Sequence, residues 1–212
     1  MHIAIAGAGM VGQFYAERWI AAGHTVTFTH VRDHGRAEAL VARLGPGTTW
    51  ATSLATGPTT DANPKPDVAV LAARFETVAR ALTDLGDLED VVVLDAVNPF
   101  NPERTGLVDL GGRTAADHIG DLLAQHGGAR HVKALHSEGV ERIRQANRPL
   151  ALFVAGDDPY AVEVAASLIH DAGLDAVATG ALATAAWSEP PGPLFGQGFS
   201  LAEAQRALEG LR

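Results

Sequence analysis

The chain contains no cysteine, and this absence excludes disulfides, thiolate metal ligands and cysteine nucleophiles. It also lacks any apolar run near the ~20 residues that a membrane-spanning helix needs, so we expect no membrane partner. Basic residues are scarce: 16 lysines and arginines against 25 acidic residues give a formal net charge of −9. A nucleic-acid binder needs a basic surface, so nucleic acid is not expected as a partner. Signatures such as HExxH and GxSxG are missing, and we expect no metal site.

What is present suits a globular protein. The 212 residues are 47% hydrophobic and 19% charged, a composition that disordered chains do not have. At this length about 70% of the surface of the unfolded chain is buried on folding, which is enough for a real core. The first residues show neither a basic leader nor a cleavage pattern, so we expect a cytoplasmic protein.

Strand-like and helix-like stretches alternate along most of the chain. Residues 67–72 (DVAVLA) and 91–95 (VVVLD) are apolar at consecutive positions, which fits strands covered on both faces of a parallel sheet. Helical patterns lie between such runs, for example at residues 11–22 and 75–85. The alternation predicts an α/β fold, a doubly wound parallel Rossmann sheet with right-handed crossovers.

The last quarter of the chain has a different character. An amphipathic helix is expected at residues 158–172, followed by a short strand and a loop rich in proline and glycine. Ser200 and Glu203 form a capping-box pattern for a final helix. We therefore expect a Rossmann domain over residues 1–156 and a small C-terminal cap domain over residues 157–212.

The strongest local signal is the GxGxxG motif GAGMVG, which follows an apolar strand and opens a helix. Gly7 permits the tight turn, Gly9 lets the backbone approach a pyrophosphate, and Gly12 lets the helix pack closely on the strand. The N–H groups of the helix N-terminus face the anion. The motif predicts dinucleotide binding, with these candidate residues: Gly7, Ala8, Gly9, Met10, Val11 and Gly12.

The end of the second strand indicates which dinucleotide is bound. An enzyme that prefers NAD places an acidic residue there for the ribose 2′-hydroxyl, whereas this chain has His30, followed by Arg32 and Arg36. Guanidinium groups match the geometry of a 2′-phosphate, which favours NADP. Asp33 is the counter-argument, because a small shift in register would place it near the ribose and favour NAD.

Three later strand ends should face the same crevice, because ligands of open α/β sheets bind beyond the carboxyl ends of the strands. Small residues after the strand at 67–72 allow close approach of a ribose or nicotinamide. Asn98 suits a carboxamide or ribose, although Asn-Pro is also a common turn former. His136 has the pKa range of a proton donor, or it caps neighbouring carbonyls instead. The candidates at these ends are Ala72, Ala73, Val97, Asn98 and His136.

Longer stretches carry a more specific signal. They read IAIAGAGMVG, AERWIAAGHTV, VVVLDAVNP, HVKALHSEG and LFVAGDDPYAVEVAASLIHDAGLDAV. Together they resemble the NADPH-dependent reductases of the deazaflavin coenzyme F420 (F420:NADP oxidoreductases). The resemblance implies a Rossmann domain with a small C-terminal domain, NADP(H) and coenzyme F420 meeting in the cleft, direct hydride transfer between their rings, and a homodimer.

The chain departs from this family at three places. His30-Val31 stands where the family usually has Ser-Arg, His136 stands where it has asparagine, and Ala73-Arg74 stands where a proline is common. The last two changes lie where the second substrate should bind. The leading hypothesis is therefore an NADP-dependent oxidoreductase with a deazaflavin or flavin-like acceptor. The alternatives are a reductase of a small carbonyl or imine with His136 as proton donor, and a non-catalytic NADP-binding module.

Overall fold

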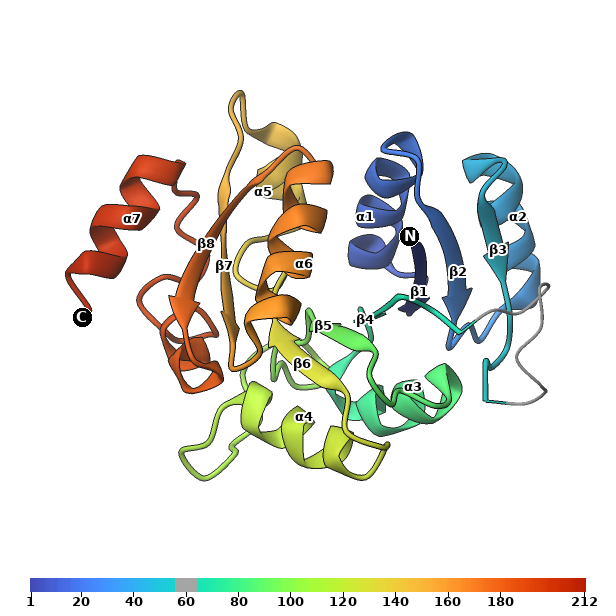
Figure 1. The fold of residues 1–212 in the computed structure, drawn as a ribbon, viewed down its shortest axis with the longest axis horizontal. Helices are drawn as coiled ribbons and strands as arrows, with labels where there is room; N and C mark the ends of the chain where they lie inside the picture. The colour runs from blue at the N-terminus through green and yellow to red at the C-terminus, as the bar shows by residue number, and fades with distance from the viewer. Residues whose placement is uncertain (56–64) are drawn as a thin grey trace.

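The computed structural model describes residues 1–55 and 65–212, which form an eight-stranded sheet with helices on both faces (Figure 1). The strands are β1 His2–Ala6, β2 Thr25–Thr29, β3 Thr48–Trp50, β4 Val68–Leu71, β5 Val92–Asp95, β6 Arg130–Lys133, β7 Ala151–Gly156 and β8 Asp175–Gly180. The α-helices are α1 Met10–Ala21, α2 His34–Leu44, α3 Val78–Leu85, α4 Ala115–Ala124, α5 Val140–Gln145, α6 Pro159–Asp171 and α7 Leu201–Glu209. Two 3₁₀ segments complete the order, η1 Phe75–Thr77 and η2 Leu182–Trp187.

The sheet has the order β3-β2-β1-β4-β5-β6-β7-β8, with the chain reversing direction across the sheet after β3. Strands β1 to β6 are mutually parallel, which confirms the doubly wound α/β class. One feature of the expected sheet is wrong: β7 runs antiparallel to β6. Antiparallel neighbours need no crossover helix that spans the sheet, and the connection here holds only the six-residue α5.

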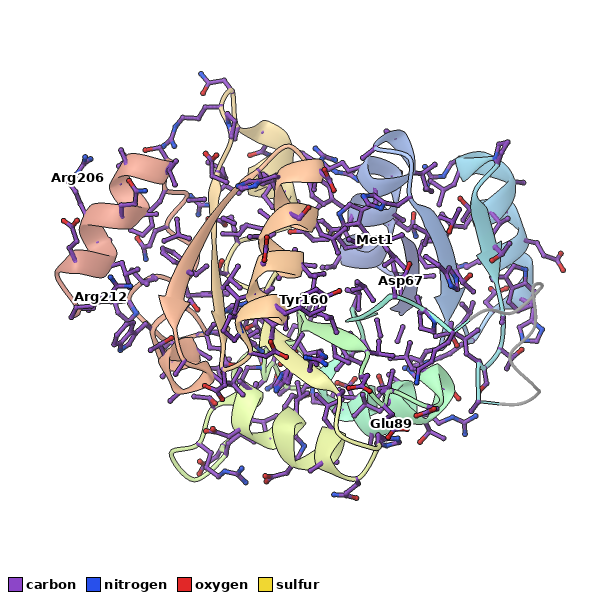
Figure 2. The ribbon with its side chains drawn as sticks, in the orientation of Figure 1. Met1, Asp67, Glu89, Tyr160, Arg206 and Arg212 are labelled. Carbon is purple, nitrogen blue, oxygen red and sulfur yellow. The ribbon has the colours of Figure 1, made fainter. Side chains whose placement is uncertain are left out.

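Apolar strand residues explain why both faces of the sheet are covered. All residues of β4 and β5 are buried, as a parallel sheet between two helix layers requires. One face packs against α1, α5 and α6, where Phe14, Ile143 and Ala165 join the core. The other face packs against α3 and α4 through Leu82 and Ile119. Figure 2 shows side chains filling the space between the sheet and both helix layers.

The C-terminal part continues the same sheet. Strand β8 pairs with β7 in parallel, and α6 packs against both strands. Helix α7 covers the opposite face through a cluster that includes Phe153, Leu194 and Leu208. Its capping box of Ser200 and Glu203 is present as predicted. No helix in the described part of the chain is long and apolar enough to cross a membrane.

Candidate active site

A cavity of about 440 Å³ lies beyond the carboxyl ends of β1, β4, β5 and β6. Its walls come from the glycine motif, from the segments that follow β4, β5 and β6, and from Phe195 in the C-terminal loop, which we define as residues 188–199. This is the crevice in which open parallel sheets bind their ligands. The predicted strand ends therefore converge on one place.

The geometry of the glycine motif matches the role expected of each glycine. Gly7 has a φ of +116°, and a Cβ there would lie 2.5 Å from the backbone oxygen of Ala72. A Cβ on Gly12 would lie only 2.1 Å from the oxygen of Gly7. A Cβ on Gly9 would meet no atom within 4 Å. The turn and the helix packing exclude side chains at Gly7 and Gly12, whereas the space at Gly9 is open for a ligand.

Helix α1 begins at Met10, and no side chain caps its N-terminus. Its first N–H groups and the positive end of its dipole are therefore available to an anion. Met10 and Val11 line the cavity, and the Met10 side chain is half exposed. Ala8 supports the loop, since its carbonyl accepts a hydrogen bond of 2.8 Å from the Gln13 side chain. The start of α1 suits the pyrophosphate of a dinucleotide.

The ends of β4 and β5 form the next part of the wall. Ala72, Ala73 and Asn98 line the cavity, whereas Val97 is buried beneath it in the core. The Asn98 Nδ2 donates to the carbonyl of His136 at 2.9 Å, which fixes the orientation of the amide. The Oδ1 atom of Asn98 is buried without a hydrogen-bond partner. Because buried polar atoms are normally paired, this acceptor suits a carboxamide or ribose donor of a bound cofactor.

His30 lies directly after β2, but its ring is held by α3. Its backbone is left-handed (φ 56°), and Nδ1 lies 2.8 Å from Oδ2 of the buried Asp84. Arg80 binds the other carboxylate oxygen of Asp84 at 2.9 Å. The protein thus holds Nδ1 of His30, whereas Nε2 is buried without a hydrogen-bond partner.

Arg32 and Arg36 are exposed beside the N-terminus of α2. Asp33 caps this helix by accepting the backbone N–H of Arg36 at 3.0 Å, and its carboxylate lies 3.4 Å from Nε of Arg36. Both described contacts of the Asp33 carboxylate are therefore with Arg36 of α2. No carboxylate of residues 1–55 or 65–212 lies within ion-pair distance of Arg32, so this guanidinium, unlike that of Arg36, does not share its charge with an acidic side chain.

His136 lines the cavity, and of its two ring nitrogens Nδ1 is buried without a hydrogen-bond partner. Its Nε2 lies 2.9 Å from Oγ of Ser188, and its side chain is almost fully buried. Burial lowers the pKa of His136 to about 3, and the Lys133 ammonium adds to this effect. At neutral pH the ring is therefore uncharged, which weighs against a role as an imidazolium proton donor.

An ionic cluster lies behind the cavity. The fully buried Lys133 ammonium is 3.1 Å from Asp95 and 3.0 Å from Glu189, and it also donates to the carbonyl of Val97. Glu189 in turn accepts two backbone N–H groups at the start of α4, at 2.7 and 2.8 Å. Burial alone would raise the pKa of Asp95, but Lys133 and a hydrogen bond from His131 outweigh it and lower the pKa to about 2. These contacts tie the end of β5 to the C-terminal loop.

The far end of the cavity contains residues that sequence reasoning did not select. The rings of Phe100 and Phe195 lie with centroids 6.3 Å apart and planes at 54°. Leu135 has a left-handed backbone (φ 65°), which is uncommon for leucine. Arg74 pairs with Glu76 at 2.8 Å and also donates to the carbonyl of Pro102. The sequence marks the segment of Phe195 only as a loop rich in proline and glycine, and no local pattern marks Phe100 or Leu135.

The described residues hold no group of three or more histidine, cysteine or acidic side chains arranged to bind a metal ion. The fold and the glycine motif define a Rossmann-type, dinucleotide-binding protein. Residues 2–99 match the model of the family described as "NADP oxidoreductase coenzyme F420-dependent". This match indicates an NADP-dependent oxidoreductase, and it includes three of the five stretches that carry the resemblance, at residues 3–12, 16–26 and 91–99. No curated protein matches the chain by sequence.

Solved structures agree on the fold. A hypothetical protein from Sinorhizobium meliloti superposes with a TM-score of 0.78 at 25% identity, over 94% of this chain and 95% of that one. A proposed F420-dependent NADP reductase from Arthrobacter sp. FB24 gives 0.70 at 23% identity, over 86% of each chain. An imine reductase from Myxococcus stipitatus in complex with NADP⁺ gives 0.60 at 16% identity, over 86% of this chain and 56% of that one.

Proposed function

We propose that the protein transfers a hydride between NADP(H) and a flat ring acceptor of the deazaflavin (coenzyme F420) or flavin type. The observation that carries this proposal is the make-up of the cavity. One end has the glycine motif and the orphaned Asn98 Oδ1, and the other has the rings of Phe100 and Phe195. Two flat rings can meet between these ends.

Each residue of the cofactor end has a distinct task in this proposal. The N-terminus of α1 binds the pyrophosphate, and Gly9 leaves room for it. Ala72 and Ala73 allow close approach of the ribose, and Asn98 orients the nicotinamide carboxamide through Oδ1. When bound, NADPH supplies a hydride from its nicotinamide ring, and the acceptor ring takes that hydride together with a proton from water.

The acceptor end supports a reaction that needs no proton from the protein. His136 is neutral and bound to Ser188, and Glu138 accepts two backbone hydrogen bonds and forms an ion pair with Arg142. The phenyl rings exclude water and offer apolar faces to a conjugated ring. We propose that residues 157–212 act as the cap of this site through Phe195.

The second candidate is reduction of a small carbonyl or imine with His136 as proton donor. Its support is the position of His136 at the cavity wall and the fold shared with imine reductases. A neutral imidazole in a buried hydrogen bond is a poor acid at neutral pH. The deazaflavin or flavin acceptor is therefore the better supported proposal.

An anaerobic spectrophotometric assay tests the proposal. NADPH and NADH would each be mixed with F420, FMN, riboflavin and a panel of small ketones and cyclic imines. We expect rapid NADPH oxidation with a deazaflavin or flavin, and slower oxidation of NADH. Turnover of an imine or ketone alone, lost in His136→Asn, would favour the second candidate. Tight NADPH binding with no turnover of any acceptor would favour a binding module.

The family resemblance also supports a homodimer, and the composition supports a cytoplasmic location. Analytical ultracentrifugation of the purified protein tests the first, and fractionation of the source cells tests the second. A monomer at micromolar concentration would contradict the expected assembly.

A further inference from the structure

Three consecutive residues after β6 each bond to the C-terminal loop. His136 binds the Ser188 hydroxyl at 2.9 Å through Nε2. The carbonyl of Ser137 accepts the backbone N–H of Gly196 at 2.8 Å. The carboxylate of Glu138 accepts the backbone N–H of Gly198 at 2.7 Å. These three hydrogen bonds hold the segment that follows β8, coloured orange to red in Figure 1, next to the residues that line the cavity.

Glu138 is the charged member of this set, and its carboxylate is almost fully buried. Oε2 binds Gly198, while Oε1 accepts the N–H of Gly139 at 2.8 Å and lies 3.1 Å from Nε of Arg142. The two backbone hydrogen bonds and the ion pair with Arg142 thus occupy both oxygens of the carboxylate. Its described partners are groups of the protein itself.

The loop passes close to the groups that Glu138 binds. Gly198 has a φ of +68°, and a Cβ there would lie 3.0 Å from Cδ of Arg142. The chain at Gly198 therefore passes directly over the Arg142 side chain that Glu138 holds. Phe195 lies three residues before this point and faces Phe100 across the end of the cavity.

We propose that Glu138 is a positioning residue that fixes the C-terminal loop, so that Phe195 forms a rigid wall for the ring of the hydride acceptor. This inference rests on the proposed function, because it assigns the acceptor to the end of the cavity that Phe195 closes. A preformed wall spares the acceptor the cost of ordering a loop when it binds. Hydrogen bonds to a charged group are strong enough that losing one changes affinity by about tenfold.

The test compares Glu138→Gln with the wild type. Glutamine keeps the shape of the side chain but offers only one acceptor oxygen and no charge to Arg142. We expect the KM for the flavin or deazaflavin acceptor to rise about tenfold, with a smaller change in kcat and an unchanged Kd for NADPH. Limited digestion with chymotrypsin, read by mass spectrometry, should cut faster after Phe195 and Phe199. Glu163→Gln, an exposed change on α6, is the matched control and should alter neither measurement.

Two results would overturn the inference. One is a Glu138→Gln protein with wild-type acceptor KM and wild-type digestion of the loop. The other is a Kd for NADPH that rises in step with the acceptor KM, which indicates general loosening. If Glu138→Gln does not fold, Ser188→Ala removes a neighbouring anchor and should give the same pattern more weakly. If the wild type reduces no acceptor, the proposed function fails, while the digestion still decides whether Glu138 holds the loop.

Discussion

The two ends of the cavity are built in different ways. At the cofactor end, Gly7 and Gly12 shape one turn through backbone contacts that lie within a few residues of each other or on the adjacent strand. At the acceptor end, Phe100, Glu138 and Phe195 come from distant parts of the chain and are held by side-chain contacts. A turn formed by local backbone contacts leaves a recognisable pattern in the sequence, whereas a wall assembled by tertiary contacts leaves none.

The largest expected effect comes from Lys133, which lies behind the cavity and joins the end of β5 to the C-terminal loop. Replacing it by methionine leaves Asp95 and Glu189 buried with no cation between them. We expect the free energy of unfolding to fall by about 3–5 kcal/mol. Urea unfolding followed by circular dichroism measures this change.

Lys65 is the only other lysine of the chain and supplies the control. It pairs with Asp87 at 3.2 Å on the surface. Lys65→Met should cost less than about 1 kcal/mol, because exposed ion pairs contribute little. Equal losses for the two variants would contradict the stabilising role that we assign to the buried cluster.

The next prediction contrasts two glycines of the cofactor end, Gly12 and Gly9. A methyl group on Gly12 would collide with the backbone oxygen of Gly7, so Gly12→Ala should destabilise the protein by about 3 kcal/mol and abolish measurable NADPH binding. Gly9→Ala meets open space in the protein, so its melting temperature should stay near the wild-type value. Its Kd for NADPH should nevertheless rise, because the methyl group occupies space meant for the pyrophosphate. Thermal melts and calorimetry measure both properties, and a stable Gly12→Ala protein with normal NADPH affinity would contradict the assigned packing role.

The same contrast explains what the sequence could predict. The α/β class, most strands and helices, and the glycine motif follow from periodicity and spacing, because those signals act over a few residues. The antiparallel β7 depends on the short α5 connection, which no pattern in the strands announces. Val97 was expected beside the cofactor. Side chains of successive residues point to opposite sides here, so Val97 is buried in the core while Asn98 faces the cavity. Two further contacts were also not predictable from local patterns, because each joins residues more than fifty positions apart. They are the contact of the His30 ring with Asp84 and the contact of Glu138 with Gly198.

A smaller effect should appear in the pH dependence of stability at the acceptor end. Burial lowers the pKa of His136 to about 3 in the folded protein, below the ordinary 6.5 of the unfolded chain. The unfolded state therefore binds the proton more readily, and stability that is complete above pH 6.5 is lost as the pH falls toward 3. Between pH 6.5 and pH 5 this amounts to about 2 kcal/mol.

His136→Gln isolates this contribution from those of the other histidines. The variant should be less stable than the wild type at pH 7.5, and the difference should shrink as the pH falls to 5. Urea unfolding at several pH values gives both curves. Parallel curves for the two proteins would mean that His136 titrates normally, and the acid role in carbonyl or imine reduction would regain support.

The smallest effect concerns the ribose at the cofactor end. Arg32 is exposed and has no carboxylate nearby in the described chain, whereas Arg36 is paired with Asp33. A phosphate contact from Arg32 would be charge-assisted and direct, while Arg36 would have to share its guanidinium with Asp33. Arg32→Ala should raise the Kd for NADP⁺ about tenfold and leave that for NAD⁺ unchanged, and Arg36→Ala should have a weaker effect. Calorimetric titration with both dinucleotides measures this discrimination. If both dinucleotides weaken equally, the arginines supply only general attraction, and selection for NADP must come from the backbone around His30.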